Sequence, residues 1–197
     1  GSDGDFTQAL WVAASGDDVV GDGSIDNPYQ TLAKGVSQAH LLNKDVYVVG
    51  GTYPQVSTLS LAGVRVFGGF GPLASGVRPH NPDLYPSRIT LGAPLFLGML
   101  AATGSTTGHE SIISGFHFVA GDHVGGILVS SSSPLIEGNV IEAPGGAGDV
   151  GIGLLVYNTV AGTINPQIKN NKIELGAISG VNGQNYGVFA VNTNNSS

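Results

Sequence analysis

Three similar six-residue phrases decide the fold of this chain. They are Ile-Ser-Gly-Phe-His-Phe (113–118), Ile-Glu-Gly-Asn-Val-Ile (136–141) and Ile-Lys-Asn-Asn-Lys-Ile (168–173). A second phrase alternates with them as Gly-Ile-Leu-Val (126–129), Gly-Leu-Leu-Val (153–156) and Gly-Val-Phe-Ala-Val (187–191). Two interleaved repeats are typical of a solenoid whose coils are built from short strands.

The first phrase also predicts which residues lie above one another in successive coils. Stacked parallel strands are about 4.8 Å apart, so the side chains of one column are in contact. The alignment predicts two inward columns, Ile113–Ile136–Ile168 and Phe118–Ile141–Ile173. It predicts two outward columns, Ser114–Glu137–Lys169 and His117–Val140–Lys172. Glu137 and Lys169 would then form a cross-strand ion pair worth a few tenths of a kcal/mol to ~1 kcal/mol.

Asparagine occupies two positions of a further column, formed by Phe116, Asn139 and Asn171 near the point where each strand turns a corner. Asparagine tolerates the left-handed backbone conformation, and its amide can hydrogen-bond to backbone groups along the stack. We therefore interpret Asn139 and Asn171 as an internal ladder rather than as catalytic groups.

The composition supports an all-β protein and excludes several classes of partner. Of the 197 residues, 11% are charged, 41% are hydrophobic and 32 are glycine, which favours strands joined by tight turns. The net charge of −7, with scattered Lys and Arg, argues against nucleic acid and anionic membranes. No apolar run approaches the ~20 residues of a membrane span. The absence of cysteine excludes disulfides and thiolate metal sites.

The pattern along the chain predicts one helix among short strands. Thr31 is placed as the N-cap of a helix over 32–42, which has an apolar stripe at helical spacing. Strands are predicted over 10–14, 46–49, 59–61, 64–67, 89–91, 95–100, 112–118 and 126–129, with Gly50-Gly51 and Gly68-Gly69 as stops. We expect 1–2 to be the remnant of a cleaved tag and 3–197 to form one domain of about five to seven coils, with an N-terminal cap over 3–45.

Residues 70–88 interrupt the repeat with four prolines and are predicted to be a surface excursion. This stretch gathers Arg78, His80, Asp83, Tyr85 and Arg88. Long loops on rigid scaffolds often carry binding residues, so a binding role and a structural role both stay open. After the last strand the tail is polar, and the open end is expected either to continue as a longer solenoid or to be covered by a partner, as in a homotrimer.

Three N-terminal stretches resemble a known family. Trp11-Val-Ala-Ala-Ser-Gly-Asp-Asp, Asp26-Asn-Pro-Tyr-Gln-Thr-Leu-Ala-Lys and Val46-Tyr-Val-Val-Gly-Gly-Thr-Tyr53 are similar to the cap and first coil of bacterial right-handed parallel β-helix proteins, the superfamily of pectate lyases and chondroitinase B. Gly63-Val-Arg-Val-Phe-Gly-Gly-Phe70 resembles the second coil of its surface-protein members, including polymorphic outer-membrane proteins and adhesive fibres.

The resemblance implies a right-handed parallel β-helix sealed by an N-terminal capping helix, with Trp11 and Tyr53 packing the cap. It does not extend to the catalytic members. The Asn-Thr-Asp, Gly-His-Gly and Arg-Ile-Lys sets of pectin hydrolases are missing, and so is the acidic calcium cluster beside an arginine base of pectate lyases.

Two groups of carboxylates are candidate sites, one for a metal ion and one for glycan cleavage. Asp17, Asp18, Asp22 and Asp26 could hold Ca²⁺, or they could form a solvated turn; no other cofactor is expected. Glu142 and Glu174 are predicted to lie roughly 5 Å apart, the separation found in a retaining glycosidase.

His117 and Lys172 are predicted on the same face as these glutamates. The candidate binding residues are therefore Arg78, His80, Asp83, Tyr85, His117, Glu142, Lys172 and Glu174. No catalytic or metal-ligating residue is assigned.

These observations favour a non-catalytic bacterial domain, secreted or on the cell surface or at a fibre tip, that mediates adhesion by binding an extracellular glycan or a surface protein. The competing hypothesis is a polysaccharide lyase or glycoside hydrolase that acts on an extracellular glycan through Glu142 and Glu174. A structural spacer within a longer chain is the third alternative.

Overall fold

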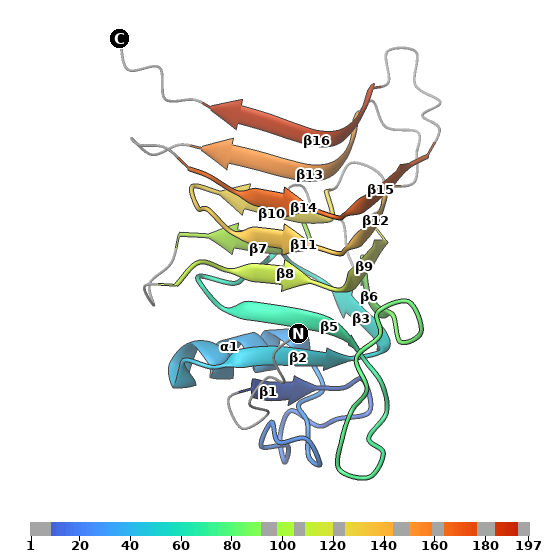
Figure 1. Cartoon of the computed structure of the whole chain (residues 1–197). Helices are drawn as coiled ribbons and strands as arrows, with labels where there is room; N and C mark the ends of the chain where they lie inside the picture. The colour runs from blue at the N-terminus through green and yellow to red at the C-terminus, as the bar shows by residue number, and fades with distance from the viewer. Residues whose placement is uncertain are drawn as a thin grey trace.

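Every strand pairing in the three sheets of this protein is parallel, and the chain visits the sheets in turn (Figure 1). The computed structural model describes residues 9–91, 98–104, 109–119, 125–143, 150–158, 164–176 and 184–192. The predicted tag remnant, residues 95–97 of the predicted strand over 95–100 and the tail after Asn192 lie outside these residues; the described strand there begins at Leu100.

The three sheets have five or six strands each. Sheet A contains β1 (Ala9–Val12), β2 (Asp45–Val49), β5 (Arg65–Phe70), β8 (Ile112–Ser114), β11 (Leu135–Glu137) and β14 (Gln167–Lys169). Sheet B contains β3 (Gly51–Gln55), β6 (Ser87–Leu91), β9 (Phe116–Val119), β12 (Val140–Ala143) and β15 (Lys172–Leu175). Sheet C contains β4 (Leu59–Ser60), β7 (Leu100–Thr103), β10 (Ile127–Ser130), β13 (Val150–Asn158) and β16 (Gln184–Asn192). One coil is one strand from each sheet, so five coils follow β1, and the predicted all-β parallel solenoid is confirmed.

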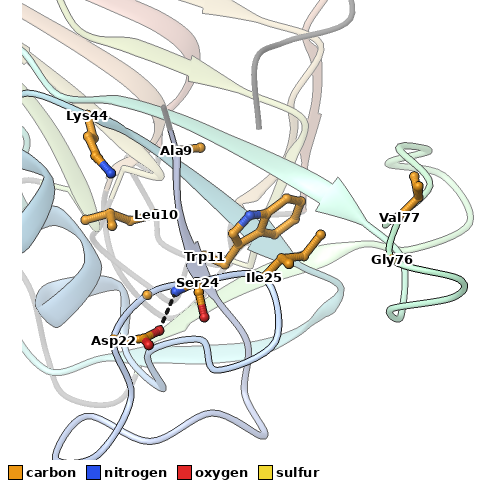
Figure 2. Close-up of a pocket in the computed structure, with 10 residues that line it drawn as sticks. Ala9, Leu10, Trp11, Asp22, Ser24, Ile25, Lys44, Gly76 and Val77 are labelled. Atoms are coloured by element: carbon orange, nitrogen blue, oxygen red, sulfur yellow. Dashed lines mark hydrogen bonds between the residues drawn. The ribbon is translucent and has the colours of Figure 1, made fainter. Parts of the chain in front are cut away.

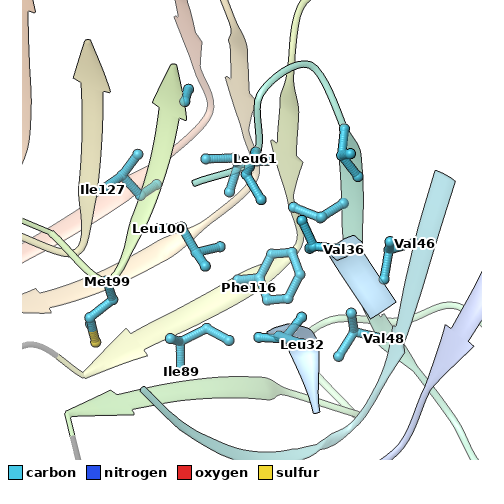
Figure 3. Packing of buried hydrophobic residues seen from close by; sticks show 14 of the residues in the cluster. Leu32, Val36, Val46, Val48, Leu61, Ile89, Met99, Leu100, Phe116 and Ile127 are labelled. Atoms are coloured by element: carbon cyan, nitrogen blue, oxygen red, sulfur yellow. The ribbon is translucent and has the colours of Figure 1, made fainter. Parts of the chain in front are cut away.

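The strand registers confirm the predicted inward columns. Ile136 lies between Ile113 and Ile168, and Ile141 lies between Phe118 and Ile173. In the inner coils these side chains are fully buried, and side chains from the strands and from the helix meet in one core (Figure 3). Parallel strands covered on one side by such a core bury a continuous apolar column.

The corner between sheets A and B is formed differently from the prediction. Residues 112–118 make two strands, because Gly115 adopts a φ of 75° between β8 and β9. The equivalent residues of the next coils are Gly138 at 65° and Asn170 at 53°. The left-handed residue is therefore the one before the asparagine column, where glycine or asparagine tolerates positive φ best.

The asparagine ladder itself is confirmed. Asn139 Oδ1 accepts the Phe116 N–H at 3.0 Å, and Asn139 Nδ2 donates to the Ile113 carbonyl at 2.9 Å. Asn171 repeats both contacts one coil later: its Oδ1 accepts the Asn139 N–H at 3.0 Å, and its Nδ2 donates to the Ile136 carbonyl at 2.8 Å. Each amide thus satisfies a backbone donor and a backbone acceptor that the corner leaves out of the sheets.

The predicted helix is confirmed as α1 (Leu32–Leu42), beside β1 and β2 at the N-terminal end of the stack (Figure 1). Thr31 is its N-cap and accepts the Lys34 N–H at 3.1 Å. Leu32, Val36 and Ala39 are buried in the main core. This helix has 11 residues, and no helix of the described chain is long and apolar enough to cross a membrane.

Glycine pairs proved to be weaker stops than predicted. A new strand, β3, begins at Gly51 directly after Gly50, and β5 continues through Gly68 and Gly69 to Phe70. A Cβ on Gly68 would lie 2.7 Å from the Gly115 carbonyl oxygen of the next coil. Glycine therefore permits a close approach between coils here.

The acidic loop after β1 covers the outer edge of that strand. Trp11 N–H donates to the Gly23 carbonyl at 2.8 Å, and Tyr29 N–H donates to the Trp11 carbonyl at 3.0 Å. Asp18 ties the loop to the start of α1, because its carboxylate accepts the N–H groups of Gln30 and Thr31 and the Thr31 hydroxyl. The edge strand thus has partners on both sides.

Removing the Asn139 amide is expected to destabilise the fold. Asn139→Ala leaves the Phe116 N–H and the Ile113 carbonyl buried without this partner, which should lower the free energy of unfolding by about 2–4 kcal/mol. Chemical denaturation monitored by circular dichroism measures the change. Ser114→Ala, on the outside of the same corner, is the control and should change it by less than ~0.5 kcal/mol. Equal effects of the two substitutions would contradict the structural role of the ladder.

Candidate functional site

Charged side chains form a row on the outer face of sheet B. The inward residues of this sheet are Tyr53, Ile89, Phe118, Ile141 and Ile173, so the residues on either side of each point outward. The outward columns are Thr52–Arg88–His117–Val140–Lys172 and Pro54–Thr90–Val119–Glu142–Glu174. The structure thus brings together four of the eight predicted residues: His117, Glu142, Lys172 and Glu174.

His117 and Glu142 are joined across neighbouring strands. The imidazole Nε2–H donates to Glu142 Oε1 at 2.6 Å. The side chains of His117 and Glu142 are 16% and 39% exposed, so solvent and solutes reach the carboxylate more readily than the imidazole. The pair is diagonal because His117 lies opposite Val140, two residues before Glu142.

Lys172 and Glu174 pair along one strand. Lys172 Nζ lies 2.5 Å from Glu174 Oε1, and both side chains are well exposed. The hydrogen bond and charge of Lys172, with a smaller contribution from the charge of His117, hold the pKa of Glu174 below its usual value. In return Glu174, and to a smaller extent Glu142, raises the pKa of Lys172.

Arg88 extends the row although it was predicted to belong to the excursion. It lies on β6 and is the register neighbour of His117. The sequence contains the signal for this placement: Arg88 precedes Ile89 as His117 precedes Phe118 and Lys172 precedes Ile173. The three six-residue phrases start at Ile113, one coil after Arg88, and therefore do not include it.

Glu142 and Glu174 are register neighbours, as predicted. Each accepts a hydrogen bond from His117 or Lys172, and Lys172 lowers the pKa of Glu174. A retaining glycosidase needs one of its two carboxyl groups protonated as a general acid. Glu174, whose pKa is lowered by Lys172, is therefore poorly suited to act as that general acid.

On sheet A, one electrostatic prediction is wrong. Glu137 and Lys169 are register neighbours, but they do not form an ion pair. Glu137 instead accepts a hydrogen bond from Asn170 Nδ2 at 3.3 Å. The exposed ammonium group of Lys169 remains solvated, which costs little at a surface.

In the excursion, Arg78 is directed inward. Its side chain is 9% exposed, and its guanidinium lies 5.5 Å from the centre of the Trp11 ring. Nη2 donates to the Ile25 carbonyl at 2.9 Å and Nη1 to the Gly71 carbonyl at 3.4 Å. Burial lowers the pKa of Arg78, and the charge of Asp26 partly opposes this. Arg78 therefore fastens the excursion to the acidic loop.

The other predicted excursion residues do not join Arg78 in one cluster. His80 donates from Nε2 to the Gly68 carbonyl at 2.9 Å and packs its ring 4.6 Å from Phe70 on sheet A. Asp83 is exposed, and the half-buried Tyr85 ring contacts Gly71. Ligand binding by these residues stays a prediction, and they lie in the loop between β5 and β6, outside the strands that carry the row.

Aromatic residues form a second small core under the excursion. Trp11 makes edge contacts with Tyr47 at 5.2 Å and Phe70 at 5.1 Å between ring centres, and Tyr47 stacks on Phe70 at 4.7 Å. Trp11 and Tyr53 are both buried, as predicted, with Tyr53 in the main core and Trp11 in this second one.

A cleft of about 550 Å³ lies beside Trp11 (Figure 2). Its wall is formed by β1, by Asp22 to Ile25 of the acidic loop and by Val77 of the excursion. In the loop, Asp22 accepts the Ser24 N–H at 2.8 Å. The cleft is on the side of the molecule that carries the excursion and does not include the row.

The acidic loop uses its carboxylates internally. Asp17 accepts the N–H groups of Val19 and Val20, and these bonds lower its pKa. Asp18 binds the start of α1, as described above. Among the described residues no three His, Asp or Glu side chains are grouped to hold a metal. Calcium binding by this loop stays a prediction.

The chain matches no family model, no curated protein and no solved structure. The class that the coordinates define is an all-β solenoid of three parallel sheets with one helix.

Replacing Lys172 is expected to change the titration of Glu174. Lys172→Met removes the hydrogen bond and the charge that lower the pKa of Glu174, so that pKa should rise toward 4.5. The pair contributes to stability above about pH 4.5, and this contribution fades as the pH falls through the lowered pKa. Carboxyl-carbon NMR titration measures the shift. Lys169→Met on sheet A is the control, and an unchanged Glu174 pKa in Lys172→Met would disprove the pairing.

Removing the Arg78 side chain is expected to expose Trp11, which is the only tryptophan. Arg78→Ala takes away the guanidinium over the indole and its two carbonyl contacts, so water should reach the ring. Tryptophan emission should shift to longer wavelength, and acrylamide should quench it more strongly. Arg88→Ala, on the outer face of sheet B, should leave both unchanged. If the emission wavelength of Trp11 does not change in Arg78→Ala, the excursion covers the indole without this contact.

Proposed function

We propose that this chain is a non-catalytic, right-handed parallel β-helix domain of a bacterial surface or fibre-tip protein, and that it binds an extracellular glycan through the outer face of sheet B. The observation that carries the proposal is the row of Arg88, His117, Glu142, Lys172 and Glu174. These side chains supply donors and acceptors at a fixed spacing of about 4.8 Å per coil on a rigid sheet.

The right-handed coiling of the proposed β-helix is supported by the strong preference of crossover connections between parallel strands for that handedness. The role of α1 as an N-terminal cap is supported by its buried face, which covers the core beside the first coils. The resemblance of the N-terminal stretches to bacterial surface β-helices supports both features and the extracellular location.

The binding mode follows from the residue types on the face. The outward columns of sheet B contain no Phe, Tyr or Trp in the described coils, so sugar stacking on an aromatic ring contributes little there. Recognition relies on polar contacts between sugar hydroxyl or charged groups and the row. Such contacts are partly screened by salt, so we expect modest affinity that falls with ionic strength.

Hydrolysis is the competing function, because Glu142 and Glu174 are register neighbours. It is disfavoured by Lys172, which lowers the pKa of Glu174 and so stabilises the charged form of that carboxylate. A hydrolase would need one group held protonated near neutral pH as its general acid.

A glycan array combined with a product assay tests the proposal. Wild-type protein should bind a subset of immobilised glycans, and the double variant Glu142→Gln/Glu174→Gln should bind at least ~10-fold more weakly because it loses two ionised acceptors. Glu137→Gln on sheet A makes the same chemical change outside the row and should bind like the wild type.

Three results of the same experiment would contradict the proposal. Reducing ends or unsaturated products that appear with wild type and disappear with Glu142→Gln would replace the proposal by the hydrolase or lyase. Binding that survives the double variant would move the site away from sheet B. If no glycan binds, the proposal is replaced by binding of a surface protein or by a role as a structural spacer.

A further inference from the structure

Sheet C differs from the other two sheets in carrying no charge. None of its five strands contains Asp, Glu, Lys, Arg or His. The strands of sheet A contain Asp45, Arg65, Glu137 and Lys169, and those of sheet B contain Arg88, His117, Glu142, Lys172 and Glu174. One long side of the solenoid is therefore electrically neutral in a chain with net charge −7.

The outward side chains of sheet C are also largely apolar. One outward column is Ser60–Ala101–Leu128–Leu155–Phe189, and its neighbour is Thr103–Ser130–Tyr157–Val191. Ala101 and Leu128 are buried, whereas Leu155, Phe189 and Val191 are half-buried and Tyr157 is 36% exposed. The accessible apolar surface therefore lies on β13 and β16, the two strands of nine residues.

We propose that this outer face of sheet C is a self-association surface, on which a second copy of the chain docks face to face. A copy of an acidic chain is repelled wherever charged faces meet, and the uncharged face offers the approach with the least repulsion. Apolar and aromatic groups without charges are also typical of the centre of interfaces. The inference does not depend on glycan binding by sheet B.

The shape of the face fits pairing about a two-fold axis. In a symmetric pair the same patch meets itself, so Tyr157 and Phe189 of one copy face the same residues of the other. Packed sheets are separated by about 10 Å, which side chains of this size fill. Both long strands run side by side at the end of the stack that is remote from α1 (Figure 1).

The size of the face sets the expected strength. The two accessible strands, β13 and β16, have nine residues each and are about 4.8 Å apart, which gives roughly 300 Å² per copy. Two copies would bury roughly 600 Å², less than the ~1,000 Å² of a stable interface and in the range of a weak, transient contact. The pair should therefore be reversible and dependent on concentration, with a dissociation constant in the micromolar range or weaker.

Sedimentation velocity across concentrations tests the proposal. Wild-type protein should shift from monomer to dimer as its concentration rises, and raising the salt concentration from low values should strengthen the dimer because it screens the like net charges. Tyr157→Glu should weaken dimerisation at least ~10-fold by placing two carboxylates at the contact. Val191→Lys on β16 should do the same, so that the test survives if one variant fails to fold.

Val119→Glu is the matched control, because it introduces the same carboxylate at a half-buried outward position of sheet B. It should dimerise like the wild type, and circular dichroism should verify that each variant is folded. A monomer at every concentration, a trimer, or a dimer that tolerates both sheet C substitutions would overturn the proposal. A dimer weakened by added salt would overturn it as well, since charged faces would then make the contact.

Discussion

Parallel pairing in register, at a single hydrogen-bond spacing from coil to coil, is the constraint on which the rest of this structure depends. It places each residue about 4.8 Å from its equivalent in the next coil. Inward, this spacing puts Ile113, Ile136 and Ile168 in mutual contact. Outward, the same register places Glu142 beside Glu174. A slip by one residue would exchange the two faces, burying charges and exposing the isoleucines.

The register needs a fixed corner, and the corner needs two kinds of residue. Gly115, Gly138 and Asn170 turn the chain with positive φ, and this removes backbone groups from the strand pairing. The side chains of Asn139 and Asn171 then satisfy these unpaired backbone N–H and carbonyl groups. Buried amide groups of this kind are costly unless every donor and acceptor has a partner, so the ladder stabilises one register and disfavours others.

The solenoid separates its chemistry by face. Sheet A carries the aromatic core beneath the excursion and the Arg78 contact, sheet B carries the charged row, and sheet C carries apolar and hydroxyl side chains. Because each coil contributes to all three faces, a short repeat can build three different surfaces on one core. Glycan recognition and self-association can therefore be placed on separate faces, where neither obstructs the other.

The sequence by itself determined the solenoid, the inward columns, the ladder, α1 and its Thr31 cap, since these depend on local periodicity and on side-chain chemistry repeated from coil to coil. It also placed His117, Glu142, Lys172 and Glu174 together, because equivalent positions of successive repeats become neighbours in the sheet. The same pattern, followed one coil back, also places Arg88 in this row. Only the tertiary structure decided that Arg78 turns inward onto Trp11, and that Glu137 contacts Asn170 rather than Lys169. The Arg78 contact joins the excursion to β1, and these two segments share no repeat. The choice between Asn170 and Lys169 depends on side-chain conformation, which the repeat does not encode.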